Sequence, residues 1–224
     1  MGGKKIHFLH IGKTGGSAVK SVLENYTSGA GYQLIIHNHR PAIDKIPPGE
    51  KIIFFLREPI SRFISGFYSR QRKGRPRYNV EWTEVERKVF GVFSTPNELA
   101  GALAAGASSE LFPIAVLALQ NIQHLKKYDF WYISHNYFQT RMDDILYVGF
   151  QENLDECFEE LGSILGLPKH ERLPIDDVTA HRNLIGLDRH ISEAGVKALN
   201  SWYASDIDFI AECKKLTFKS EIRN

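Results

Sequence analysis

The sequence has few cysteines, almost no net charge and no long apolar run. Cys157 and Cys213 are the only cysteines among 224 residues, and neither has a CxxC partner or a nearby ligand pair, so we expect buried free thiols. Lysine and arginine total 28 against 26 acidic residues, and a net charge of +2 argues against a nucleic-acid-binding or membrane-surface protein. No stretch approaches the roughly 18 uninterrupted apolar residues of a membrane helix, so no membrane span is predicted.

Apolar runs of strand length alternate with amphipathic helical patterns along the chain. With 43% hydrophobic residues this length can bury one core, and we expect a single domain over residues 1–224. The alternation predicts an α/β fold with a central parallel sheet flanked by helices, a helical C-terminal half, and ligands at the carboxyl ends of the strands. The predicted strands are 5–11, 33–36, 51–56 and 145–150; the predicted helices are 17–26, one beginning at Pro59, most of 81–137, 154–165, 189–200 and 203–215.

A glycine-rich loop follows the first predicted strand and opens the first predicted helix. Successive backbone N–H groups at a helix N-terminus bind anions, and glycines let a phosphate approach the main chain closely. Lysine adds a mobile positive charge, and threonine and serine add hydroxyl donors. An ordinary glycine-rich turn is the alternative interpretation. The candidate phosphate-binding residues are Gly12, Lys13, Thr14, Gly15, Gly16 and Ser17.

Two features of a nucleotide triphosphatase are missing. The P-loop pattern GxxxxGK[ST] needs a glycine five places before Gly12, and that residue is His7. The strand 51–56 ends in Arg57-Glu58-Pro59, which offers a cation where a magnesium site requires a carboxylate. We therefore expect no metal site.

Two blocks resemble the PAPS-dependent carbohydrate sulfotransferases, where PAPS is 3′-phosphoadenosine 5′-phosphosulfate. Residues 10–17 (HIGKTGGS) are similar to that family's 5′-phosphosulfate loop, HIPKTGGTS, with glycine in place of proline. Residues 56–68 resemble its 3′-phosphate element, an arginine at a strand end and a serine eight residues later, here Arg57 and Ser65. An arginine can bind a phosphate through two N–H groups, while serine donates from the helix. A surface salt bridge with Glu58 is the alternative for Arg57.

The triplet His37-Asn38-His39 resembles the His-Gly-His of heparan sulfate 2-O-sulfotransferases. By that resemblance His39 is the general base and His37 assists it. Asparagine replaces glycine, so the two histidines can exchange roles, and a purely structural histidine is also an alternative. Glu58 is a second candidate base. Lys13 would lie near the bridging oxygen of the donor and offset charge on the leaving group.

Two further basic segments are candidates for binding. His181-Arg182-Asn183 is similar to the late His-x-Asn segment of the family, so Arg182 is a candidate contact to the 3′-phosphate. Residues 70–77 hold five basic residues in eight, and a solvated loop is the alternative to a site for an anionic acceptor. The candidate substrate-binding residues there are Arg70, Arg72 and Arg75.

The resemblance implies a P-loop-kinase-like fold and transfer of a sulfuryl group from PAPS to a hydroxyl, leaving PAP (adenosine 3′,5′-bisphosphate). The family favours a carbohydrate acceptor, although a lipid or peptide hydroxyl would present the same chemistry. A kinase or NTPase and a noncatalytic anion- or glycan-binding domain on the same fold are the rival hypotheses. We expect a cytoplasmic protein if the chain is complete, and a lumenal, Golgi-type one if a membrane anchor was trimmed.

Overall fold

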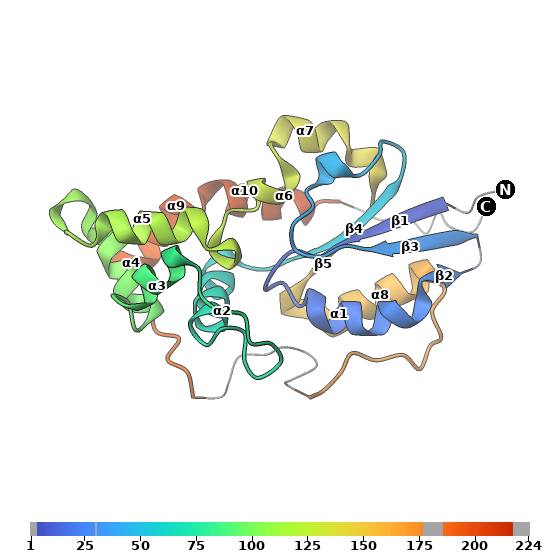
Figure 1. The fold of residues 1–224 in the computed structure, drawn as a ribbon. Helices are drawn as coiled ribbons and strands as arrows, with labels where there is room; N and C mark the ends of the chain where they lie inside the picture. Colours follow the sequence, from blue (N-terminus) through green and yellow to red (C-terminus); the bar gives the residue numbers. More distant parts are fainter. Residues whose placement is uncertain (1–3, 30, 177–185, 217–224) are drawn as a thin grey trace. The chain divides into compact units, whose positions relative to one another are not determined.

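The computed structural model describes residues 4–29, 31–176 and 186–216, which divide into two compact units (Figure 1). The described residues of Met1–Arg57, Tyr128–Ala180 and Phe209–Asn224 form unit 1, and those of Glu58–Lys127 and His181–Asp208 form unit 2. The single domain expected over residues 1–224 stays a prediction, because the division into two compact units does not test it.

Unit 1 is an α/β unit built on one sheet. In the described residues the sheet has five strands in the order β2-β3-β1-β4-β5, of which β3, β1, β4 and β5 are mutually parallel and β2 is antiparallel to β3. The α/β class and the parallel sheet predicted from the sequence are confirmed. The strands are β1 (Lys4–Leu9), β2 (Ser28–Gly29), β3 (Tyr32–Ile36), β4 (Lys51–Leu56) and β5 (Ile145–Phe150).

Helices make up most of the remaining described residues. Unit 1 contains α1 (Gly16–Leu23), α6 (Asp129–Tyr132), α7 (His135–Thr140), α8 (Leu154–Leu165) and the end of α10 (Ala204–Cys213). Unit 2 contains α2 (Pro59–Gln71), α3 (Glu84–Phe90), α4 (Pro96–Ala105), α5 (Phe112–Asn121) and α9 (Glu193–Trp202). Among the described residues, no helix combines the length and the apolar character that crossing a bilayer requires.

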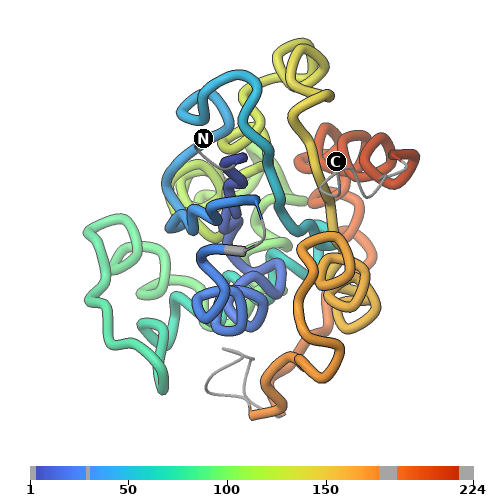
Figure 2. Tube along the Cα trace, turned by 90° about the vertical axis from the view of Figure 1, so that its right-hand side faces the viewer, coloured from blue at the N-terminus to red at the C-terminus, as the bar shows by residue number. Residues whose placement is uncertain are grey.

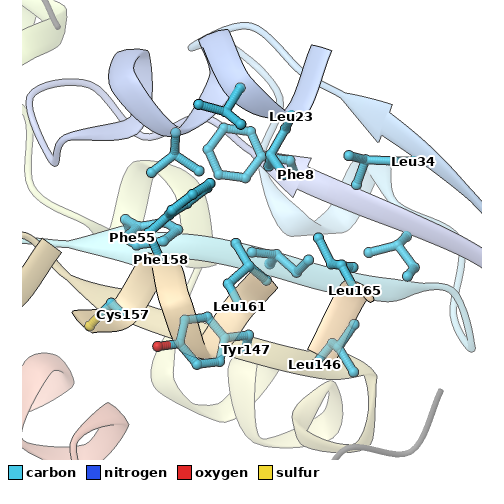
Figure 3. Packing of buried hydrophobic residues seen from close by; sticks show 14 of the residues in the cluster. Phe8, Leu23, Leu34, Phe55, Leu146, Tyr147, Cys157, Phe158, Leu161 and Leu165 are labelled. Atoms are coloured by element: carbon cyan, nitrogen blue, oxygen red, sulfur yellow. The ribbon is translucent and has the colours of Figure 1, made fainter. Parts of the chain in front are cut away.

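The central strands are buried on both faces, which explains their nearly continuous apolar sequences. Phe8 and Phe55 point to one face, where α1 and α8 contribute Leu23 and Phe158 to the same cluster (Figure 3). Phe54 points to the other face and packs against residues of α6, α7 and α10. Figures 1 and 2 both place α1 and α8 on one side of the sheet and α7 on the other. Helices therefore cover both faces and leave the strand ends as the place for a site.

Unit 2 is helical and has its own apolar core. Phe63 and Phe67 of α2 are buried against residues of α3, α4, α5 and α9. Pro59 stands in the first turn of α2, where its missing N–H costs no hydrogen bond. The stretch 81–137 was predicted to be mainly helical, and the structure confirms this as several short helices.

The two cysteines are buried free thiols, as predicted. Cys157 lies in the cluster on the α1 and α8 face, and its sulfur accepts a hydrogen bond from the Phe150 amide at 3.3 Å. Cys213 is fully buried on the opposite face, and burial raises the pKa of its thiol far above the ordinary value. Both side chains act as small apolar groups of the core.

Candidate functional site

The candidate phosphate loop lies at the point where the strand order of the sheet reverses. β1 pairs with β3 on one side and with β4 on the other, so successive strands are added first to one edge of β1 and then to the other. In open parallel sheets, ligands bind at such a point, outside the carboxyl ends of the strands. Residues 12–17 follow β1 at this edge, and Arg57 follows β4.

Hydrogen bonds within the loop fix its backbone. The Ile11 amide donates to the Leu9 carbonyl at 3.0 Å, and the Thr14 hydroxyl donates to the Ile11 carbonyl at 2.9 Å. Thr14 is fully buried, so its hydroxyl holds the loop together rather than pointing outward to a ligand. The predicted role of this hydroxyl as a phosphate donor is corrected accordingly, and the place of Thr14 in the nucleotide-binding set rests on its backbone amide.

The two glycines at the start of α1 are required by space, and Gly15 is also required by its backbone angle. Gly15 has φ +84°, and a Cβ there would lie 2.8 Å from the Leu154 Cδ2 atom. A Cβ on Gly16 would lie 2.5 Å from Cδ2 of the His10 ring. As the N-cap, Gly15 has no side chain to bind the first amides of the helix. The loop thus brings bare backbone to the rim of the sheet, with half-buried Ser17 in the first turn.

Lys13 and Arg57 meet at this rim. Lys13 is half-buried with φ +69°, and its carbonyl accepts a hydrogen bond from Nη1 of Arg57 at 3.4 Å. The Arg57 backbone is fixed in turn by the buried Tyr128, whose hydroxyl accepts from the Arg57 amide at 2.9 Å and donates to the Arg57 carbonyl at 2.8 Å. Two cationic residues are therefore held side by side where β1 and β4 end.

His39 lies against the phosphate loop. Its Nδ1 is 2.9 Å from the His10 carbonyl oxygen, and the two rings are 4.0 Å apart between centroids. A carbonyl only accepts hydrogen bonds, so Nδ1 carries a proton, and in the neutral ring Nε2 carries the lone pair. Trp131 fixes the backbone by donating from Nε1 to the His39 carbonyl at 3.0 Å. This tautomer and position suit a proton acceptor beside the loop.

His37 has a different environment. Its Nε2 is 2.8 Å from Nδ1 of His7, and Nε2 of His7 is 2.6 Å from a carboxylate oxygen of Glu50. Lys5 also contacts that carboxylate, at 3.0 Å. Burial lowers the pKa of His37, and the charge of His7 lowers it further, which favours a neutral imidazole at neutral pH.

Glu58 and Ser65 belong to unit 2. The two carboxylate oxygens of Glu58 accept hydrogen bonds from the amides of Ile60 at 2.8 Å and Ser61 at 2.7 Å, so Glu58 is the N-cap of α2. This contact gives the second candidate base a structural role. Ser65 is buried within α2. Because Arg57 belongs to unit 1 and Ser65 to unit 2, their joint contact with a 3′-phosphate stays a prediction.

The three candidate arginines of the basic loop differ in their contacts. Arg70 forms a bidentate pair with Glu86, with N–O distances of 2.5 and 2.9 Å, and the two side chains are 12% and 6% exposed. Arg72 donates to the Arg75 carbonyl at 2.6 Å, and exposed Arg75 donates to Asn79 at 2.9 Å. Arg70 therefore ties the end of α2 to α3, and the substrate-binding roles of Arg70, Arg72 and Arg75 stay predictions.

Arg182 was predicted to contact the 3′-phosphate, and it lies outside the described residues. Among the residues that the structure does describe, no three His, Cys, Asp or Glu side chains are grouped to hold a metal ion.

Sequence reasoning missed the residues that support the rim from behind. His7 contacts His37 and is itself bound by Glu50, while Tyr128 and Trp131 bind the backbones of Arg57 and His39. The one available signal was His7, a polar residue inside an apolar strand. Scans of protein-family models, curated proteins and solved structures each found no match to this chain.

Proposed function

We propose that this chain transfers a sulfuryl group from PAPS to a hydroxyl of an acceptor, with a carbohydrate as the preferred class. The observation that carries the proposal is the meeting of residues 12–17, Arg57 and His39 at the strand-order reversal of the sheet. Cationic side chains, bare helix amides and a neutral imidazole are what binding of a phosphosulfate and deprotonation of a hydroxyl require. The P-loop-kinase-like fold is part of this proposal.

The residues present fit the donor. The first amides of α1 and the Lys13 ammonium would hold the 5′-phosphosulfate, because Gly15 as the N-cap has no side chain to bind these amides. Arg57 would bind the 3′-phosphate, with Ser65 and Arg182 as its predicted partners. PAP is the product that remains on these residues. The bound donor supplies an activated sulfuryl group with a phosphate leaving group.

His39 performs the proton step in this proposal. With its proton on Nδ1 held by the His10 carbonyl, the Nε2 lone pair takes the proton of the acceptor hydroxyl as the new oxygen–sulfur bond forms. The bond from sulfur to the bridging phosphate oxygen breaks in the same displacement. Lys13 offsets the negative charge that develops on that oxygen. Its loss should therefore slow the chemical step more than it weakens binding.

The test is transfer of labelled sulfate from PAPS to a panel of glycans, with Lys13→Ala and His39→Ala as variants. We expect each variant to lose about 100-fold or more in rate, the range typical of general bases and of groups that stabilise transition-state charge. Lys20→Ala, in α1 and paired with Glu24 at 3.5 Å, is the matched lysine control. Exposed His170→Ala is the histidine control. Equal product from the variants and the controls would refute the mechanism.

A kinase on the related fold is separated by nucleotide preference. It would bind ATP with magnesium more tightly than PAP, whereas the sulfotransferase binds PAP more tightly without a metal. The residue at the first glycine position of a P-loop is His7, whose side chain bonds to His37 and Glu50, and this favours the sulfotransferase.

A further inference from the structure

A line of three ionisable side chains runs beneath the histidine triplet. His37 follows β3, His7 lies on the neighbouring strand β1, and Glu50 immediately precedes β4. The His37–His7 and His7–Glu50 distances are 2.8 and 2.6 Å, and the planes of the two imidazole rings are within 13° of parallel. His7 is 5% exposed, so the middle of the line is shielded from water.

The Glu50 carboxylate at one end of this line determines which ring nitrogens of His7 and His37 carry protons. A carboxylate accepts hydrogen bonds, so Glu50 requires a proton on Nε2 of His7. When His7 is neutral, its Nδ1 therefore has the lone pair and accepts a hydrogen bond from Nε2–H of His37. The lone pair of His37 is then on Nδ1. When His7 is charged, both of its nitrogens carry protons, and Nε2 of His37 becomes the acceptor instead.

We propose that His7 and Glu50 are positioning residues of a proton relay, through which His37 passes a proton inward from the rim and itself remains neutral. A proton arrives on Nδ1 of His37, and the proton on Nε2 moves to Nδ1 of His7. On His37 one N–H bond forms at Nδ1 and one breaks at Nε2, and on His7 one N–H bond forms at Nδ1 while its Nε2–H bond is kept. The positive charge ends on His7, 2.6 Å from the negative charge of Glu50.

The charges around the relay favour this end state. Glu50 accepts hydrogen bonds from Lys5 and His7. The bond from Lys5 has the largest effect on the pKa of Glu50, and together with the bond from His7 it keeps this pKa below its ordinary value, although desolvation raises it. The carboxylate thus stays ionised when His7 gains its proton. Burial lowers the pKa of His37, and a charge on His7 lowers it further, so His37 does not keep a second proton. The charged groups that face the line are Lys5 and His7 from β1, His37 from the end of β3, and Glu50.

The relay distinguishes the two histidines of the triplet. The Nδ1–H of His39 is bound by the neutral backbone carbonyl of His10. His37 is linked through His7 to an ionised carboxylate. A role of the relay in sulfuryl transfer rests on the proposed function: the relay would be a second acceptor, besides His39, for the proton of the acceptor hydroxyl. The protonation states of His37 and His7 themselves do not rest on that function.

The experiment is a ¹⁵N NMR titration of the histidine rings of the full chain between about pH 5 and 8, without nucleotide or acceptor. We expect His37 to change from the Nε2–H to the Nδ1–H tautomer while it remains neutral, as His7 becomes the imidazolium. Exposed His170 is the reference ring in the same spectra. A His37 ring that gains a second proton while His7 stays neutral would overturn the proposal, as would a His37 tautomer that does not change.

Glu50→Gln and His7→Phe test the two positioning residues separately. Glutamine keeps a hydrogen-bond acceptor for Nε2 of His7 but removes the negative charge that favours a proton on His7. In Glu50→Gln, His37 should therefore become the imidazolium. His7→Phe should leave His37 to titrate alone. If the buried substitution prevents folding, Glu50→Gln still decides the matter, because its side chain is 21% exposed. An unchanged His37 titration in Glu50→Gln contradicts the relay.

A kinetic measurement links the relay to the reaction. If the chain transfers sulfate from PAPS, Glu50→Gln should reduce kcat about tenfold and shift the acidic limb of the pH profile, with little change in KM for PAPS, because a group acting through another histidine has this size of effect. Unchanged kcat and pH profile would exclude a role in the reaction. Absence of transfer in the wild type would refute the proposed function while the NMR result stands.

Discussion

The rim of the sheet in unit 1 and the basic loop of unit 2 are both rich in cations, yet their cations are used differently. At the rim, Lys13 and Arg57 are positioned through backbone groups: a carbonyl of Lys13 and an amide and carbonyl of Arg57. In the basic loop, Arg70 and Lys73 contact the carboxylates of Glu86 and Glu81. The number of positive residues in a segment therefore does not indicate binding, because an acidic partner distant in sequence can neutralise them.

The largest expected effect comes from breaking the ion pair of Arg70 with Glu86. Arg70→Gln should lower the free energy of unfolding by about 3 kcal/mol, because it leaves the buried Glu86 carboxylate without its cation. Denaturant titration measures this. Arg75→Gln is the control, and its exposed side chain should change stability by about 0.5 kcal/mol or less. PAP affinity should be unchanged in Arg70→Gln, and a stable variant with weaker glycan binding would show that Arg70 binds substrate after all.

The strands of the sheet could be predicted from the sequence far better than the side-chain contacts that distinguish the rim of the sheet from the basic loop. β4 and β5 were predicted with their observed bounds, since strands buried on both faces are continuous apolar runs. β2 was missed because two residues at a sheet edge carry no periodicity.

Side-chain partners depend on tertiary structure. His7 and Glu50, which contact each other, are 43 residues apart in the sequence. Arg70 and Glu86 are 16 residues apart and lie in two different helices. A local pattern could suggest the phosphate loop and the triplet, because each is a contiguous segment. It could not identify the side chains behind them, nor that the Thr14 hydroxyl bonds within its own loop.

The second effect concerns the rim. Gly16→Ala should weaken PAP binding by at least about tenfold, because the new Cβ would lie 2.5 Å from the His10 ring and force the loop or the ring to move. Isothermal titration calorimetry with PAP measures the loss. Gly101→Ala in α4 meets nothing within 4 Å and should bind PAP normally and gain up to about 1 kcal/mol of stability. Equal PAP affinity in Gly16→Ala would mean that the loop is not the phosphate site.

A smaller effect tests the support behind Arg57. Tyr128→Phe removes the hydroxyl that bonds both the amide and the carbonyl of Arg57, so it should cost about 1–2 kcal/mol of stability and weaken PAP binding about threefold. Tyr32→Phe is matched to it, because it removes one buried hydroxyl bonded to the Leu165 carbonyl at 3.0 Å. The two variants should lose similar stability and differ in PAP affinity. A similar affinity loss in both would assign the effect to general destabilisation.

The smallest effect is a difference in pH dependence. Burial tends to raise the pKa of Glu86, but hydrogen bonds from Arg70 and Thr83 outweigh it and hold the pKa below the ordinary value. A depressed folded-state pKa contributes stability that is complete above the unfolded pKa of about 4.3 and is lost as the pH falls through the folded value. Unfolding free energy measured from pH 6 to pH 3 should therefore fall less steeply in Arg70→Gln than in the wild type. Parallel curves would contradict this role of the pair.

The central claim, that the rim is a two-phosphate site for a sulfuryl donor, is tested most directly by calorimetric titration of the wild-type chain with PAP, AMP and ATP with magnesium. The account predicts that PAP binds without a metal and at least about tenfold more tightly than AMP, which lacks the 3′-phosphate, and more tightly than ATP with magnesium. Binding of ATP with magnesium in preference to PAP, or equal affinity for PAP and AMP, would contradict it.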